Sequence, residues 1–534
     1  MVFHRIVALV FTFSGALLAS PSITGIYNAA GWMPSNLPNA GVARGGMFTV
    51  TGSGLGPSTL QQVESYPLPT TQGLAGVTIS VNVGGVNENC IMIYAVSGQV
   101  AAILPSATPA GTGTLTLSYQ GAEAAYPIHV LEANFGAFTL NQGGSGPAVI
   151  KNGANQPITM VNPAHPGDTL VLWGTGLGPI TGDETEPPKQ VDLGTGVRVL
   201  IGNQPATVVY GGRGSSPGLD QINFVVPQGV TGCKVSVAVT VHGVTGNTTT
   251  MSVAPSGQAT CGDTYGALTS ENLAKSVTNG YLDIADIEIS RVAQTNDTLL
   301  AFFGRYPLAS LLASYGGQFG PSIGSCLAYE IQGSTLEFTD PIKPEFLSAG
   351  PELTLNGPGG QMNVHDLSTG YYVETLATAP ETYIHPGPYS VSNGSGGANV
   401  GAFDWDLMLE NYVTPTNMPA SVNLSQDLTL TWSGGSAYPI VSIFAINGVK
   451  SETAGLNSYA YVLCTAEGSA GKFTIPSAIM SMLPPDGYGT PTKPGVNLQI
   501  AGIPSERFTI AGSPGIDAGI FTVFVTSGGV ARIE

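Results

Sequence analysis

Charged side chains are scarce in this sequence. Lys, Arg, Asp and Glu together make up 9% of its 534 residues, against roughly 25% in an average soluble protein. Basic residues are the rarest of them, with 16 against 34 acidic residues and a formal net charge of −18. Because this charge repels phosphate groups and anionic membrane surfaces, we do not expect nucleic acid as a partner.

Metal-binding patterns are also lacking. The six histidines include no pair at a ligand spacing, and the five cysteines include no C-x-x-C, which argues against zinc. An acidic protein is compatible with calcium, but no loop carries a strong calcium-ligand pattern. We therefore expect no cofactor.

Five cysteines are an odd number, so at least one has no partner within the chain. We expect a disulfide between Cys233 and Cys261, which bracket the end of the second of two repeats described below. A second is expected between Cys326 and Cys464. Cys90 is then left over, and its setting in Cys-Ile-Met-Ile-Tyr is typical of a small buried hydrophobe.

Long apolar runs are confined to the first twenty residues. His4-Arg5 precedes an apolar run at 6–18, and the small residues Ala19-Ser20 follow. This layout is typical of a signal peptide, here residues 1–20, and is too short for a comfortable membrane span. No later stretch is expected to form a transmembrane segment. We therefore expect an exported protein, secreted or at the cell surface, where disulfides persist.

Gly and Pro are abundant, with 73 and 39 residues. They show no collagen-like period and separate short runs of alternating apolar and polar residues, such as Val77-Thr-Ile-Ser-Val-Asn-Val83. Alternation places the apolar side chains on one face of a strand. Because such runs recur along the chain, we predict an all-β protein rather than a disordered one.

The chain contains an internal duplication. The stretch Gly45-Gly-Met-Phe-Thr-Val-Thr-Gly-Ser-Gly-Leu-Gly-Pro57 is nearly repeated at Gly167-Asp-Thr-Leu-Val-Leu-Trp-Gly-Thr-Gly-Leu-Gly-Pro179, 122 positions later. Gln99 and Gln221 have the same offset. A self-match at a fixed offset indicates a duplicated structural unit. Short strands at regular turn spacing within each copy are typical of a two-sheet sandwich.

These features resemble a known family. An Asn-Ala-Ala lead-in, a strand ending in G-x-G-L-G-P, a Gln-x-x-x-x-x-Pro strand and a Val-rich C-terminal pair resemble the Solibacter-type C-terminal domain of uncharacterised secreted proteins, common in Acidobacteria. The layout is similar to IPT/TIG immunoglobulin-like modules. The second copy is the closer match, because Ala43-Arg-Gly-Gly46 of the first replaces a typical Pro-Gly turn. The resemblance implies Ig-like folds in an extracellular setting, and it carries no catalytic residues.

We therefore expect a first Ig-like domain at 22–134 and a second at 135–255. Residues 256–534 are expected to form a larger β-sandwich region, either one body or two with a boundary near 390–425, where the Gly/Ser/Asn loop Ser390–Ala398 lies. Leu308–Ala313 is the one stretch there that favours a short helix. The predicted fold is thus all-β, with tandem Ig-like β-sandwiches followed by a larger C-terminal β-sandwich region.

Catalytic motifs lack their structural context. The glycine-rich corners have neither the spacing nor the following helix of a dinucleotide site. Residues 214–218 and 320–324 satisfy G-x-S-x-G, but a nucleophile elbow needs a strand before the serine and a helix after it. We therefore interpret Ser216 and Ser322 as loop serines and predict no catalytic residues.

One stretch of the C-terminal region is a candidate for ligand contact. If Asp404-Trp-Asp406 is extended, both carboxylates face one side and Trp405 faces the other. That arrangement suits calcium, sugar contact or glycosidic cleavage, with His365-Asp366 and His385 within reach only if the fold brings them close. The competing interpretation is a polar strand edge with a buried Trp.

Two functions are compatible with these observations. The first is a non-catalytic secreted or cell-surface structural or adhesive protein, whose partner, an extracellular glycan or a cell-surface protein, the sequence does not identify. The alternative is an extracellular carbohydrate-active enzyme or carbohydrate-binding protein with its site in the C-terminal region. The alternative predicts a groove there, lined by aromatic rings and paired carboxylates.

Overall fold

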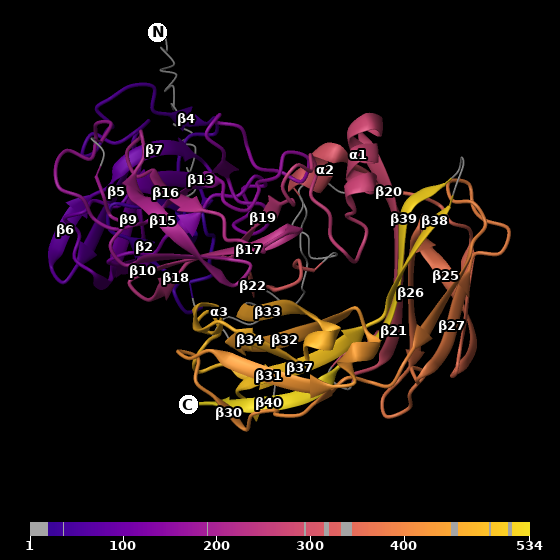
Figure 1. Cartoon of the computed structure of the whole chain (residues 1–534). Coiled ribbons are helices and arrows are strands. Elements are labelled where there is room, and N and C mark those ends of the chain that lie inside the picture. The colour runs from indigo at the N-terminus through magenta and orange to yellow at the C-terminus, as the bar shows by residue number, and fades with distance from the viewer. Residues whose placement is uncertain are drawn as a thin grey trace, which may run out of the picture.

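The computed structural model describes residues 20–35, 37–188, 191–292, 295–313, 320–332, 344–449, 458–490, 493–510 and 515–534. Residues 1–19 of the predicted signal peptide, which spans 1–20, lie outside the described residues. Strands dominate the described chain, as Figure 1 shows, and the all-β prediction is confirmed. None of the helices described is long and apolar enough to cross a membrane.

The first module is a sandwich of two sheets around a hydrophobic core, and its described strands pair antiparallel except β2 and β10, which are parallel. In β5, the four apolar residues of the predicted alternation are buried, whereas Thr78, Ser80 and Asn82 are more exposed. The lead-in, which we did not predict to be a strand, forms β1 and pairs with β3. The described strands are β1 (Ser22–Asn28), β3 (Met47–Ser53), β8 (Gln99–Ile103), β7 (Ile91–Val96) and β4 (Gln61–Gln62) in one sheet, and β2 (Val42–Ala43), β10 (Ala122–Leu131), β9 (Gly111–Tyr119), β5 (Val77–Val83) and β6 (Val86–Asn89) in the other.

The second module has its own core, and its two sets of strands are joined where β14 pairs with β15. In Figure 1 its purple strands lie beside the indigo strands of the first module. Its described strands are β11 (Gly136–Ala137), β12 (Ile150–Lys151), β13 (Thr169–Thr175), β14 (Val197–Ile201), β15 (Gln204–Arg213), β16 (Asp220–Val225), β17 (Gly232–Val241), β18 (Val244–Thr245) and β19 (Thr249–Val253).

The duplication seen in the sequence extends to strand register. Met47 pairs with Ile103 between β3 and β8, and Thr169 pairs with Val225 between β13 and β16. Both partners are shifted by the same 122 positions. The neighbouring strands β7 and β15 each carry an irregularity in register just before a tyrosine, Tyr94 or Tyr210. The two modules therefore share a central pairing pattern, not only a sequence motif.

The C-terminal region contains two large sheets, drawn mainly in orange and yellow in Figure 1. The chain crosses between them repeatedly, and one hydrophobic cluster includes residues of both. The first sheet, as described, comprises β20 (Tyr281–Arg291), β21 (Asp297–Pro307), β23 (Glu345–Phe346), β24 (Glu352–Gly357), β25 (Gly360–Ser368), β26 (Tyr371–Ala377), β27 (Gly387–Ser392), β28 (Asp404–Leu409), β38 (Ser505–Ile510) and β39 (Ile516–Val525).

The second large sheet is accompanied by a small one of three described strands. The large sheet comprises β22 (Ser325–Gln332), β30 (Ser421–Val422), β32 (Ile440–Val449), β33 (Ser458–Glu467), β35 (Tyr488–Thr490), β36 (Lys493–Pro494), β37 (Val496–Ile503) and β40 (Ser527–Ile533); the small one comprises β29 (Thr414–Pro415), β31 (Leu428–Ser433) and β34 (Lys472–Ile475).

The helices differ in part from expectation. The predicted helix forms as α2 (Leu308–Ala313), but α1 (Ser270–Asn279) and the short α3 (Ser477–Met480) were not predicted. The boundaries of α1 follow ordinary capping: the Thr269 side chain accepts a bond from the Asn272 N–H, and Gly280 ends the helix at φ 79°. The loop Ser390–Ala398 overlaps the end of β27 and the connection to β28, and these two strands pair within one sheet.

The structure contains two disulfides, and they are the two pairs expected from the sequence. Cys233–Cys261 ties β17 of the second module to the segment before α1. Cys326–Cys464 joins directly opposite residues of β22 and β33. Cys90 is a free cysteine in the core of the first module.

Candidate functional site

A cavity of about 650 Å³ lies where the second module meets the C-terminal sheets. Its size is within the range of small-molecule sites. It is bordered on one side by 229–232 of the second module, together with 262–266 and 320–324. Strands β20, β39, β32 and β33 supply the other walls. We refer to it as the junction cavity.

Strand alternation explains which side chains reach the junction cavity. On β32 the lining residues are Ile440, Ser442 and Phe444, every second position. On β20 they include Asp286 and Glu288, which pair with Ile520 and Thr522 of the parallel strand β39. Because successive side chains of a strand point to opposite faces, each strand presents one face here and buries the other.

The two carboxylates of β20 are the distinctive polar groups of the cavity. Burial, and then the charge of Glu288, raise the pKa of Asp286 from 3.8 to about 8. Burial also raises the pKa of Glu288, opposed by a hydrogen bond with Ser290. Two acids on one strand face disfavour ionising both in a site of low polarity. At neutral pH the Asp286 carboxyl is therefore mostly protonated.

Aromatic residues of several segments also line the cavity. The ring centroids of Phe444 and Tyr461 lie 6.0 Å apart at an interplanar angle of 52°. Burial, followed by Tyr329 and Glu288, raises the pKa of Tyr461, so its hydroxyl stays neutral. Phe524 and Tyr265 also line the cavity. The site thus combines acidic groups with apolar, ring-bearing walls.

The remaining acidic groups of the lining are Asp263 and Glu467. Asp263 has structural partners: its carboxylate accepts bonds from the Ser322 hydroxyl at 2.7 Å and from the Cys233 N–H at 3.0 Å. The Ser322 oxygen also accepts a bond from the Lys234 N–H at 2.9 Å. Ser322 is therefore a loop serine, as expected, and its hydrogen bonds hold that loop to the second module. The G-x-S-x-G match has no nucleophile elbow around it.

The predicted ligand-contact stretch lies elsewhere, on β28. Asp404 and Asp406 are exposed on one face, and Trp405 is buried on the other, as alternation requires. Trp405 stacks on Phe403 and Phe508, with ring centroids 4.3 and 4.8 Å away. Its ring is therefore used for packing and is not free to stack on a sugar. The arrangement is that of a polar strand surface with a buried Trp.

His365 and His385, which the sequence left as possible neighbours of Asp404 and Asp406, have local partners of their own. His365 Nδ1 lies 3.6 Å from the carboxylate of Glu352, its cross-strand neighbour. His385 Nε2 lies 3.3 Å from the Thr382 hydroxyl. Among the described residues, no group of three His, Cys, Asp or Glu side chains is arranged to hold a metal ion.

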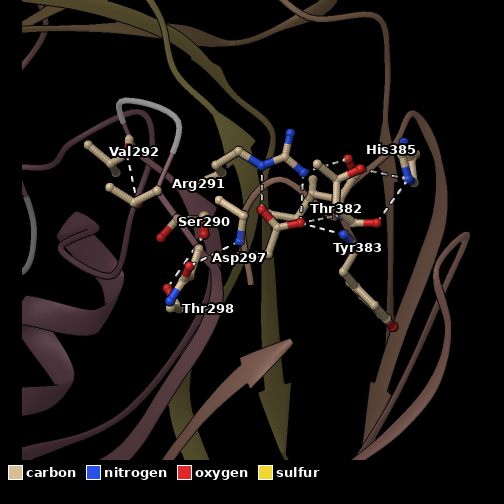
Figure 2. Close-up of polar contacts among 12 residues, drawn as sticks. Ser290, Arg291, Val292, Asp297, Thr298, Thr382, Tyr383 and His385 are labelled. Carbon is tan, nitrogen blue, oxygen red and sulfur yellow. Dashed lines mark hydrogen bonds and ion pairs between the residues drawn. The ribbon is translucent and has the colours of Figure 1, made fainter. Parts of the chain in front are cut away.

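The most connected ion pair of the C-terminal region is structural. Asp297 is fully buried and binds the Arg291 guanidinium and the backbone N–H groups of Tyr383 and Ile384, as Figure 2 shows for the labelled residues. Burial opposes ionisation, but the Arg291 and backbone bonds outweigh it and lower the pKa of Asp297. This network joins the end of β20 and the start of β21 to the segment before β27.

A second buried pair joins the two modules. The guanidinium of Arg213 pairs with Asp220 and donates to the carbonyl oxygens of Gly45 and Gly178, both at 2.8 Å. The Thr175 hydroxyl accepts from the Met47 N–H at 2.8 Å. We call these contacts the intermodule joint. In the glycine-rich corner of the second copy, the N–H groups of Gly176 and Leu177 both donate to the Asp220 carboxylate of the same chain.

Sequence reasoning did not identify Asp286 and Glu288 as site residues. Asp286 and Glu288 stand at alternating positions of the run Leu282–Ile289, and they could have been noted as two carboxylates on one face of a strand. Such a pattern normally indicates a solvent-facing strand surface. Only the packing of distant segments over that face converts it into a cavity wall.

No protein-family model matches the chain, and no curated protein matches it. Solved structures with some likeness include Bacteroides ovatus SGBP-B of a mixed-linkage glucan utilization locus, in complex with a mixed-linkage heptasaccharide, at 9% identity, with 85% of this chain and 97% of that chain covered and a TM-score of 0.14. Domains 5–6 of the S-layer protein SbsC are 16% identical over 44% of this chain and 99% of that one, with a TM-score of 0.15. Sidekick-1 immunoglobulin domains 1–4 are 9% identical over 95% and 99%, with a TM-score of 0.11. These TM-scores are too low to carry an argument about function.

Proposed function

We propose that this chain is a secreted or cell-surface structural or adhesive protein that is not an enzyme. Tandem Ig-like sandwiches would serve as its rigid body, and it would belong with the Solibacter-type secreted domains that its repeats resemble. The observation that carries the proposal is the intermodule joint. Its buried Arg213–Asp220 pair and the bonds from Arg213 to two carbonyl groups hold the modules in one relative position.

A fixed joint suits a protein that acts by shape. Interfaces between domains of one chain are commonly small and permit relative motion. Here, however, the charged Arg213–Asp220 pair is buried at the boundary. Separating the modules would expose the pair to water or leave the Arg213 guanidinium without its partner in the first module. The two disulfides, which persist outside the cytosol, further support an exported setting.

Two measurements test the proposal. Cell fractionation of a producing bacterium should place the epitope-tagged full chain at the surface or in the medium, and retention in the cytoplasm would contradict export. The purified protein should leave panels of polysaccharides and peptides uncleaved. Hydrolysis that is lost in Asp404→Ala or in Glu288→Gln would show that the protein is an enzyme.

One observation favours the alternative of a carbohydrate-active or carbohydrate-binding protein. The predicted groove of aromatic rings and paired carboxylates has a counterpart in the junction cavity, with Asp286, Glu288 and Tyr461. A neutral saccharide needs rings on which to stack and polar groups for its hydroxyls. Soluble oligosaccharides are therefore included as probes in the experiment that follows.

A further inference from the structure

We propose that the junction cavity binds a small organic cation, with an ammonium or quaternary ammonium group held by the carboxylates of Asp286 and Glu288 and by the aromatic rings that line the same cavity. This inference goes beyond the proposed structural function and does not depend on it. Its failure would leave the fold, the joint and the export of the protein unaffected.

The charge of the cavity wall is the first argument. Every charged side chain among the described residues that line the cavity is acidic: Asp263, Asp286, Glu288 and Glu467. Asp263 is satisfied by Ser322 and by the Cys233 N–H. The lining contains no basic side chain to pair with the β20 acids, so a ligand that brings positive charge would favour their ionised forms.

The aromatic walls are the second argument. Phe444 and Tyr461 present rings at an angle to one another, and Phe524 packs with Ile503 in an apolar patch beside Phe444. Ring faces attract cations, by about 0.5–2 kcal/mol each depending on solvent exclusion. A site lined by acidic groups alone would favour a hydrated metal ion. A site that combines a few acids with aromatic rings favours an organic cation with an apolar surface.

The third argument is the accessibility and size of the site. The cavity is partly open and has a volume of about 650 Å³, enough for a ligand larger than a single ion. Its walls come from three separate parts of the chain: the second module, the segment around α1 and the C-terminal strands. A bound ligand would therefore contact all three of these parts of the chain at once.

Choline and its neutral carbon isostere form the most direct pair of probes, because they share shape and differ in charge. Isothermal titration calorimetry on the full chain should show choline binding at least about tenfold more tightly than the isostere, since the cation–carboxylate and cation–ring terms are lost. Butylamine tests a primary ammonium group, and a soluble glucan oligosaccharide tests the carbohydrate alternative.

Variants separate the cavity from general charge. Asp286→Asn and Glu288→Gln should each weaken choline binding at least about tenfold. Asp286→Asn is expected to fold, because its amide is neutral like the protonated carboxyl that the cavity already favours. Phe444→Leu keeps an apolar side chain and should weaken choline more than the isostere. Asp404→Asn, the same substitution on the exposed face of β28, is the matched control and should leave binding unchanged.

The pH dependence provides a separate readout. Choline keeps its charge at every pH, so a change in affinity reports on the protein. The groups near Asp286 are Glu288 on its own strand, Tyr461 and Glu467 on β33, and Asp263 with Tyr265 before α1; Lys234 and Arg507 act on Asp263. A cation favours ionised Asp286, so affinity should rise between about pH 6 and about pH 9, with a proton released on binding.

The outcomes are distinct. Preferential choline or butylamine binding that depends on Asp286 and Glu288 supports the proposal. Equal binding of choline and its isostere, binding of the oligosaccharide alone, or no binding of any probe at millimolar concentration overturns it. A loss of affinity in Asp404→Asn as large as that in Asp286→Asn would also overturn it, because it would assign the effect to net charge.

Discussion

The first and second modules share a pairing pattern but differ at the corner after their first repeated strand. In the first module, the Leu55 N–H bonds to the carbonyl oxygen of Ser97. In the second, the equivalent Leu177 N–H bonds to the Asp220 carboxylate at 2.8 Å. Asp220 occupies the position of Gly98, 122 residues earlier. The same corner is thus closed by backbone in one copy and by a charged side chain in the other.

The difference shows how a duplicated unit acquires a new contact. Gly98 and Ser53 are exposed in the first module, whereas their equivalents Asp220 and Thr175 are fully buried in the second, against the first. The strand pairing did not change, because backbone bonds and alternating apolar positions specify it. Thr175 at the end of β13 and Asp220 at the start of β16, together with Arg213, form the polar centre of the joint.

The largest expected effect is that of Asp220→Asn. It leaves the buried Arg213 guanidinium without its counter-charge, which should lower the free energy of unfolding by about 3–5 kcal/mol. The measurement is chemical denaturation, following the first transition. Gly98→Ala is the matched control: a Cβ there has 3.8 Å to its nearest neighbour, and the change should stay within about 0.5 kcal/mol. Similar stabilities for the two variants would contradict the joint.

The Cys233–Cys261 disulfide provides the next test, because the first module contains only the free Cys90. The bridge closes a loop with a sequence separation of 28, so the chain-entropy model predicts that Cys233→Ala/Cys261→Ala costs about 3.5 kcal/mol. Differential scanning calorimetry should show the loss in the second module. The pairing is wrong if mass mapping of the unreduced protein finds Cys90 bridged instead.

Thr175→Val tests the smaller polar contact of the joint. The substitution keeps the shape but removes the hydroxyl that accepts from the Met47 N–H and donates to the Gly218 carbonyl. A buried N–H left without a partner costs about 1–3 kcal/mol. Ser53→Ala, at the equivalent exposed position of the first module, should be within about 0.5 kcal/mol of the parent. Equal losses of stability for the two variants in thermal denaturation would show that Thr175 makes no contact that Ser53 lacks.

The smallest effect is expected for Glu132→Gln. Arg44 and Glu132 form an ion pair of the first module at 2.8 Å, but the Glu132 side chain is 61% exposed. An exposed pair contributes about 0–1 kcal/mol, and salt screens it. The second module has Pro166 and Ala254 at the equivalent positions. If Glu132→Gln lowered the denaturation midpoint as much as Asp220→Asn does, the buried ion pair would be no more important for stability than the exposed one, and the comparison would be contradicted.

Much of the fold was predictable because it depends on local patterns. Alternation in Val77–Val83 and in Asp404–Leu409 matches the observed faces of β5 and β28. The helix α1 was missed because Ser270–Asn279 is mostly polar and buries little apart from Leu273 and Ser276. Its caps, Thr269 and Gly280, were the available signals. The candidate site was placed on β28 because a Trp between two Asp is conspicuous, whereas tertiary packing uses that Trp as core.

The sequence by itself determined the strands, the duplication and the chemical character of the chain, because side-chain alternation, glycine corners and charge balance act within a few residues. Tertiary structure alone decided which acids became functional candidates. Asp286 and Asp404 are both alternating acids on strands, but segments of the second module and of 262–266 and 320–324 enclose only the first. Desolvation and a second charge then change its chemistry, and neither can be read from neighbours along the chain.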